Sequence, residues 1–103
     1  MTRQIELTGK SGARYRYTSI EEERFLPPAG ANYVIARVTS GEPLVVYAGE
    51  TGNLASQDWR PTLEKAREQY KDAKVLTRLN VTRAVREAER VDLIEQYNPP
   101  MNQ

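Results

Sequence analysis

The N-terminal part of the chain alternates between apolar and polar positions on both sides of a short glycine-containing segment. Ile5 and Leu7 alternate with polar residues before residues 9–12, and Tyr15 and Tyr17 do so after them. Alternation with a period of two is typical of strands with one buried face, and glycine favours a tight turn between them. The pattern therefore predicts an N-terminal β-hairpin.

Two longer apolar runs, residues 33–38 and 44–48, are rich in β-branched and aromatic side chains and are separated by a polar segment with glycine and proline. Such runs predict a second pair of strands. This pair is more apolar than the first, so we expect it to be central in the sheet. Residues 21–30 carry charges and chain breakers without a period and are expected to form an exposed connection.

The second half of the chain has two stretches of helical spacing around one more strand. Pro61 suits the first turn of a helix, and apolar residues then recur every three or four positions. Residues 74–79 alternate and predict a third strand of the main sheet. Thr82 can cap a last helix, which residues 98–100 end. We expect the inner face of this helix to consist of Val81, Ala84, Val85, Ala88, Val91, Leu93 and Ile94.

These elements predict one small α/β (α+β) domain with a central, mostly antiparallel sheet flanked by helices. Residues 1–30 would form the extra hairpin and its connection, and residues 31–103 the remainder of one folding unit. A length of 103 residues suits a single hydrophobic core.

Composition limits the chemistry that the chain can perform. It contains no cysteine and no histidine, which excludes thiolate nucleophiles, disulfides, imidazole bases and metal sites built on Cys or His. Any catalysis must rely on Tyr, Lys, Arg, carboxylates or a metal held by oxygen ligands. The net charge of +1 argues neither for nor against a nucleic acid partner.

Nothing in the apolar pattern indicates a membrane segment. The chain has no run of about 20 apolar residues, and its first residues lack the apolar stretch of a signal peptide. We therefore expect a cytoplasmic protein without a membrane partner.

Four short segments occur in an order and spacing that resemble the GIY-YIG nuclease superfamily. They are residues 31–33, residues 47–49 at the end of the next predicted strand, residues 92–94, and residues 98–102. The resemblance covers residues 31–102, and each segment alone has low specificity. Tyr33 and Tyr47 match the motif tyrosines, Gly49 matches the glycine that ends the second motif, and Asn102 belongs to the C-terminal segment.

The resemblance implies a small GIY-YIG-like domain that cleaves the DNA backbone with a divalent cation, Mg²⁺ or Mn²⁺. In such enzymes the two tyrosines position and deprotonate the attacking water. An arginine on the first helix neutralises the phosphate, and a glutamate on a later helix holds the metal. Positioning and charge stabilisation are what phosphoryl transfer most requires.

Two positions depart from this family pattern. The arginine position aligns with Gln57, which has no charge, although Arg60 lies about one helical turn further on. The metal-binding glutamate aligns with Arg90, and a guanidinium cannot be a metal ligand. The neighbouring Glu89 points about 100° away on a helix and reaches the metal only if the helix is rotated or shifted in register.

Arg83, Arg86 and Arg90 have the spacing of one helical stripe. The stripe can be a solvated face offset by Glu87 and Glu89, or a ridge that binds phosphate in place of the metal.

The favoured interpretation is a nucleic-acid-processing domain with lost or impaired cleavage and weak binding of DNA, in which Gln57, Arg83, Arg86 and Arg90 contact phosphate. One alternative is an active endonuclease in which Arg60 and Glu89 take over the two roles, with Glu89 as the metal ligand. Another is a protein-interaction module that uses the extra hairpin. The sequence leaves the oligomeric state and the preferred form of DNA open.

Overall fold

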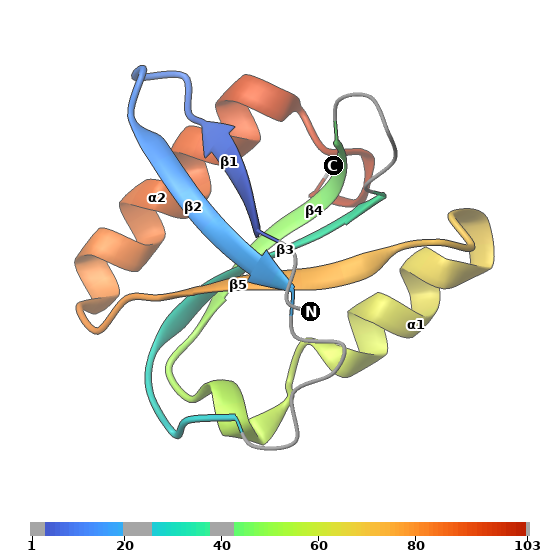
Figure 1. The fold of residues 1–103 in the computed structure, drawn as a ribbon, viewed down its shortest axis with the longest axis horizontal. Coiled ribbons are helices and arrows are strands. Elements are labelled where there is room, and N and C mark those ends of the chain that lie inside the picture. Colours follow the sequence, from blue (N-terminus) through green and yellow to red (C-terminus); the bar gives the residue numbers. More distant parts are fainter. Residues whose placement is uncertain (1–3, 20–25, 38–42, 103) are drawn as a thin grey trace.

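The chain forms a five-stranded antiparallel sheet and two α-helices, as seen in a computed structural model that describes residues 4–19, 26–37 and 43–102 (Figure 1). The predicted α+β class, with its N-terminal hairpin, is confirmed. The elements are β1 (Gln4–Thr8), β2 (Arg14–Ser19), β3 (Ala31–Arg37), β4 (Leu44–Thr51), the 3-10 helix η1 (Leu54–Ser56), α1 (Arg60–Gln69), β5 (Lys74–Leu79), α2 (Arg83–Tyr97) and the 3-10 helix η2 (Pro100–Asn102).

The strand order is β1-β2-β5-β3-β4, so β5 lies between the two strand pairs that precede it in the sequence. The prediction that the second pair is central is right for β3 and wrong for β4, which forms an edge. β5 pairs with β3 along six residue pairs, from Ala31–Leu79 to Ala36–Lys74. Among the described residues, it pairs with β2 through Thr18–Thr77 and Ser19–Leu76.

β3 is buried on both faces because different elements cover each face. Tyr33 and Ile35 belong to one apolar cluster, which α1 completes with Leu63 and Ala66. Val34 and Ala36 belong to a second cluster, completed by α2 and the hairpin through Leu93, Leu7 and Tyr17. Figure 1 shows the two helices on different sides of the twisted sheet.

Both helices begin close to the predicted residues, although α1 ends at Gln69 and the side chain of Thr82 makes no capping hydrogen bond at the start of α2. Pro61 occupies the first turn of α1, where a missing N–H costs no helical hydrogen bond. Asn98 ends α2 in the left-handed conformation, with φ of 47°, and its N–H donates to the carbonyl of Ile94. In the part of the chain described, no helix is long and apolar enough to cross a membrane.

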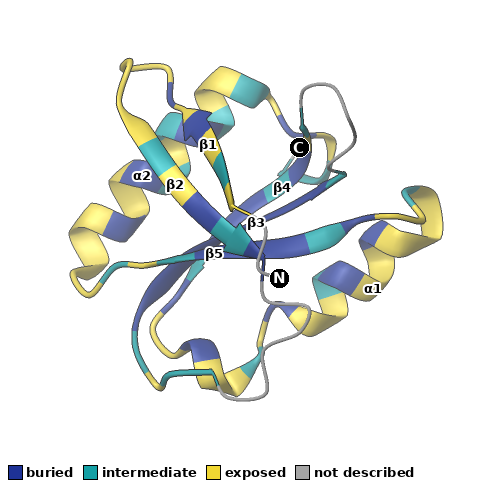
Figure 2. Cartoon of the chain, in the orientation of Figure 1, coloured by how far each residue is buried: buried dark blue, intermediate teal, exposed yellow. Residues whose placement is uncertain are grey.

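The predicted inner face of α2 is right for Leu93 and Ile94, which pack in the second apolar cluster, and wrong for its other residues. Val81, Val85 and Val91 are 82%, 52% and 39% exposed, and Ala84 and Ala88 are exposed as well (Figure 2). The buried residues of α2 are Arg86, Glu89 and Leu93. A helix can bury two charged side chains only when each finds partners, and the partners found here are described below.

Candidate functional site

The two tyrosines of the predicted motifs lie together at the β3–β4 pair. The rings of Tyr33 and Tyr47 are stacked, with their centroids 6.0 Å apart. Gly49 is the β4 residue directly opposite Tyr33. A Cβ on Gly49 would lie 2.6 Å from Cζ of Tyr33 and 2.9 Å from Cε2 of Tyr47. Glycine is therefore required for the two rings to pack over this strand.

Tyr33 is held in its neutral form. Burial raises the pKa of Tyr33, and the neighbouring Tyr47 and Asp58 raise it further. At neutral pH its hydroxyl is protonated and can donate a hydrogen bond.

Asn102 links the C-terminal segment to the strand that carries Tyr47. Its side-chain oxygen accepts from the N–H of Ala48 at 2.8 Å, and its amide donates to the carbonyl of Ala48 at 3.0 Å. The side chain thus satisfies both backbone groups of an edge-strand residue, which fixes η2 against β4.

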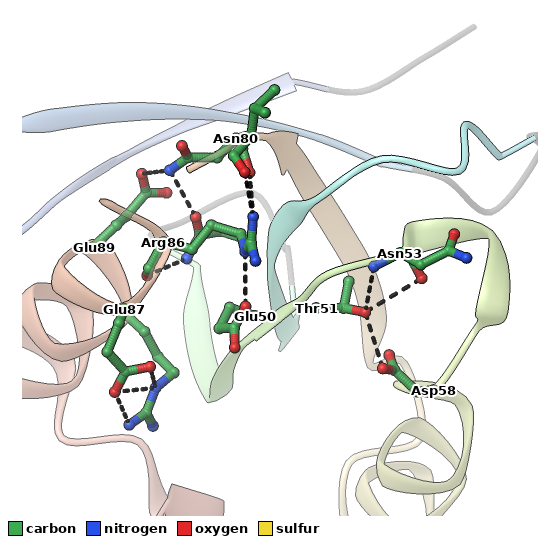
Figure 3. Close-up of polar contacts among 11 residues, drawn as sticks. Glu50, Thr51, Asn53, Asp58, Asn80, Arg86, Glu87 and Glu89 are labelled. Atoms are coloured by element: carbon green, nitrogen blue, oxygen red, sulfur yellow. Dashed lines mark hydrogen bonds and ion pairs between the residues drawn. The ribbon is translucent and has the colours of Figure 1, made fainter. Parts of the chain in front are cut away.

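The loop after β4 is organised around Thr51. The hydroxyl of Thr51 donates to Asp58 at 2.9 Å, while Asn53 accepts from the N–H of Ala55 and caps η1 (Figure 3). These bonds hold Asp58 close enough to Tyr33 to affect its pKa. Thr51 belongs to the segment of residues 50–54 that resembles the family's loop into the first helix, but no sequence signal indicated Asp58.

Gln57 and Arg60 contact each other at the start of α1. Gln57 adopts the left-handed conformation and accepts from Nε of Arg60 at 2.8 Å. The guanidinium of Arg60 also lies 5.4 Å from the ring centroid of Trp59. Arg60 is exposed, so the start of α1 carries a solvent-accessible cation two residues after Asp58 in the sequence.

Arg86 is a buried cation with its own partners. Its Nε donates to Glu50 at 2.8 Å, and its Nη1 donates to the carbonyls of Asn80 and Val81 at 3.1 and 2.7 Å (Figure 3). It also passes close to Gly30, where a Cβ would lie 2.2 Å from Nη1. Arg86 therefore neutralises Glu50 and joins α2 to the sheet, and it is not free to hold a phosphate.

Arg90 is a partly exposed arginine of α2 that lies near Tyr47 and Glu50. Its hydrogen bonds to Glu87, the shortest at 2.6 Å, raise its pKa most, and Tyr47 and Glu50 also contribute. The guanidinium is partly exposed. Arg83, the third arginine of the predicted stripe, is exposed in the first turn of α2. The three arginines thus have different environments and do not form one free basic ridge.

Glu89 points away from Arg90, toward the N-terminal hairpin and β5. It is 3% exposed, accepts from the hydroxyl of Tyr17, and pairs with Arg78 at 2.7 Å and with Asn80 at 3.4 Å. Burial raises its pKa. The expectation that Glu89 is an exposed partner of helix arginines is wrong. Glu89 and Arg60 have no partner in common, so the structure does not bring these two residues together.

The residues around the tyrosines do not fit a divalent cation. Within the described ranges, no group of three or more Asp and Glu residues lies close enough to share a metal ion. Glu50, which follows Gly49 directly, is already paired with Arg86 and is also near Arg90. With the guanidinium groups of Arg86 and Arg90 already near the Glu50 carboxylate, binding of a divalent metal ion there would be opposed by electrostatic repulsion.

Comparison with known proteins gives no assignment: no protein-family model, curated protein or solved structure matches this chain.

Proposed function

We propose that this chain is a GIY-YIG-type nucleic-acid-processing domain that has lost metal-dependent cleavage and binds the phosphate backbone of DNA weakly. The observation that carries the proposal is the position of Arg90. It stands where the family resemblance aligns a metal-binding glutamate, and it lies close enough to Tyr47 and Glu50 for their charges to affect its pKa. A guanidinium in that place repels a metal and attracts a phosphate.

Phosphate contacts would come from two sides of the tyrosine pair. Arg60 extends from the start of α1, next to the loop that carries Asp58, and Arg90 extends from α2. The half-buried Tyr47, stacked on Tyr33, can donate a hydrogen bond from its hydroxyl. Arg86 has a supporting role, because it neutralises Glu50 and removes a charge that would repel phosphate.

Binding of this kind would be weak. The whole chain carries a net charge of only +1, and Arg90 must share its guanidinium with Glu87. Each phosphate contact releases counterions from the DNA, and the free energy gained by this release falls as the salt concentration rises. The affinity should therefore decrease steeply with added salt.

The active-endonuclease alternative is disfavoured by the same geometry. It requires Glu89 to reach a metal beside the tyrosines, but the Glu89 carboxylate is engaged by Tyr17 and Arg78 on the other side of α2. The cation near the tyrosines is Arg90.

Fluorescence anisotropy with a labelled DNA duplex, titrated at several salt concentrations, tests the binding. Arg60→Ala and Arg90→Ala should each reduce the salt slope by about one unit. Arg16→Ala removes the same charge from an exposed position of β2 and should leave the slope unchanged. No binding at low salt would exclude DNA as the partner.

A plasmid-nicking assay with Mg²⁺ and with Mn²⁺ tests the loss of cleavage. The unmodified protein should leave the plasmid intact. Nicking that disappears in both Tyr33→Phe and Glu89→Gln would show that the domain is an active nuclease.

A further inference from the structure

The two arginines of the proposed phosphate site are held in the same way, each by an acceptor three residues earlier in the sequence. Gln57 accepts from Nε and Nη2 of Arg60, and Glu87 accepts from Nε and Nη2 of Arg90. Nε and Nη2 form one edge of the planar guanidinium, and such an edge can hold two oxygens of one phosphate. In both places, an internal acceptor therefore occupies the position that a phosphate would take.

The two acceptors differ in charge. Gln57 is a neutral amide, and among the described residues no carboxylate forms a salt bridge with Arg60. Glu87 is a carboxylate, and its hydrogen bond to Arg90 lowers its pKa, so it is ionised at neutral pH. Arg60 therefore keeps its positive charge, whereas the charge of Arg90 is neutralised by its partner.

The pair of Arg90 and Glu87 is accessible to solvent and can be separated. The two side chains are 31% and 49% exposed. An ion pair of this exposure is weak, because water solvates both groups when they part and salt screens their attraction. A phosphate can therefore replace the carboxylate at a modest cost in free energy. Glu87 lowers the affinity of Arg90 for phosphate without abolishing it.

Gln57 occupies a backbone position at which a long polar side chain is unusual. Its φ is 55°, in the left-handed region that favours glycine, and its N–H donates to the carbonyl of Leu54 to end η1. Glycine would adopt this conformation with less strain, but it would offer no acceptor to Arg60. The side-chain oxygen of Gln57 orients Arg60 and leaves its charge available.

We propose that Glu87 is an autoinhibitory residue that competes with phosphate for Arg90, and that Gln57 is a positioning residue that orients Arg60 without neutralising it. Both arginines contact phosphate in the complex, but Arg90 must first leave Glu87 and so contributes less to the affinity. This inference rests on the proposed function and assigns part of its weak binding to one carboxylate of α2.

Exchanging the two acceptors tests the proposal, because glutamate and glutamine have nearly the same shape and differ in charge. Fluorescence anisotropy with a labelled DNA duplex at one low salt concentration measures the affinity. Glu87→Gln should raise the affinity about two- to fivefold, and Gln57→Glu should lower it by a similar factor, the range expected for one exposed ion pair. Glu95→Gln is the matched control: it removes the same charge from an exposed position of α2 and should have a clearly smaller effect.

Double variants separate competition at an arginine from a general change of charge. In the Arg90→Ala background, Glu87→Gln should give only the small gain of Glu95→Gln, because no guanidinium remains to be released. In the Arg60→Ala background, Gln57→Glu should have an equally small effect. Arg60→Ala should weaken binding by the unmodified chain more than Arg90→Ala does, and the two losses should become equal once Glu87 is glutamine. Circular dichroism checks that every variant is folded.

Equal gains in Glu87→Gln and Glu95→Gln would overturn the role of Glu87, and so would a gain that persists without Arg90. A Gln57→Glu chain that binds as tightly as the unmodified one would overturn the role of Gln57. These results all require measurable binding, so they leave the proposed function standing. Absence of DNA binding in every variant, Glu87→Gln included, would instead refute the proposed function and this inference with it.

Discussion

Replacing Glu89 with alanine should destabilise the fold strongly, although glutamate is a residue usually found on surfaces. Its carboxylate accepts from the hydroxyl of the fully buried Tyr17 and pairs with Arg78. Removing it leaves the Tyr17 hydroxyl without its acceptor, which costs about 1–3 kcal/mol. The one lost methylene group adds about 0.8 kcal/mol of apolar burial.

Arg78 contributes less to this cost, because its side chain is 36% exposed and can be hydrated when its partner is removed. The expected loss for Glu89→Ala is therefore about 2–4 kcal/mol, a large part of the roughly 5–15 kcal/mol that stabilises a typical domain. Tyr17→Phe should cost only about 1 kcal/mol, because Glu89 keeps Arg78 and Asn80 as partners.

Urea denaturation at neutral pH, followed by the fluorescence of Trp59, measures these losses, since Trp59 is the single tryptophan of the chain and is buried. In the double variant Glu89→Ala/Tyr17→Phe, the second change should lower the free energy of unfolding by less than Tyr17→Phe does alone, because the hydrogen bond between the two side chains has already been removed. A Glu89→Ala protein that unfolds within about 0.5 kcal/mol of the unmodified chain would refute the buried position of this carboxylate.

Three further outcomes are expected. Leu93→Asp should destabilise by about 4 kcal/mol or more in urea denaturation, whereas Ala88→Asp should change stability by less than about 1 kcal/mol, because only Leu93 is buried. Hydrogen bonds from the hairpin turn lower the pKa of Asp92 in the folded chain, so the ionised carboxylate stabilises the fold above its unfolded pKa, and this stabilisation is lost as the pH falls. The thermal unfolding temperature of Asp92→Asn should therefore change less between about pH 5 and pH 3 than that of the unmodified chain. Gln57→Arg combined with Arg90→Glu should produce Mn²⁺-dependent plasmid nicking that neither change produces alone, because catalytic groups act as a unit; a double variant that leaves the plasmid intact would contradict the proposed origin of the site.

The secondary structure was predictable because its signals are local. Alternation predicted the N-terminal hairpin and β5, Pro61 marked the first turn of α1, and residues 98–100 marked the end of α2. Each of these signals depends on the residue's own backbone preferences or on neighbours a few positions away.

The orientation of α2 was not predictable from local pattern. Its apolar residues recur at helical spacing and indicate an inner face, but the burial of Arg86 and Glu89 depends on partners far along the chain. Glu50 is 36 residues from Arg86, and Tyr17 is 72 residues from Glu89. Such pairings are visible only once the strands are assembled, and they decide which side of the helix faces inward.

The candidate site was predictable in part for the same reason. Motif spacing predicted Tyr33, Tyr47 and Gly49 as site residues, and these three lie in contact in the structure. The contributions of Asp58 and Glu50 were missed, because each acts through a side chain on another element.

The position of β5 has a consequence for how the chain folds during synthesis. The β1–β2 and β3–β4 pairs are both complete in sequence by Thr51, yet they share no described strand pairing and are joined only through β5. A nascent chain that ends before Lys74 therefore holds two separate ribbons, each with unpaired strand edges, and ribbons of two strands are marginally stable in water. Assembly of the sheet must wait until Leu79 has left the ribosome, which makes the insertion of β5 the step that commits the chain to its fold.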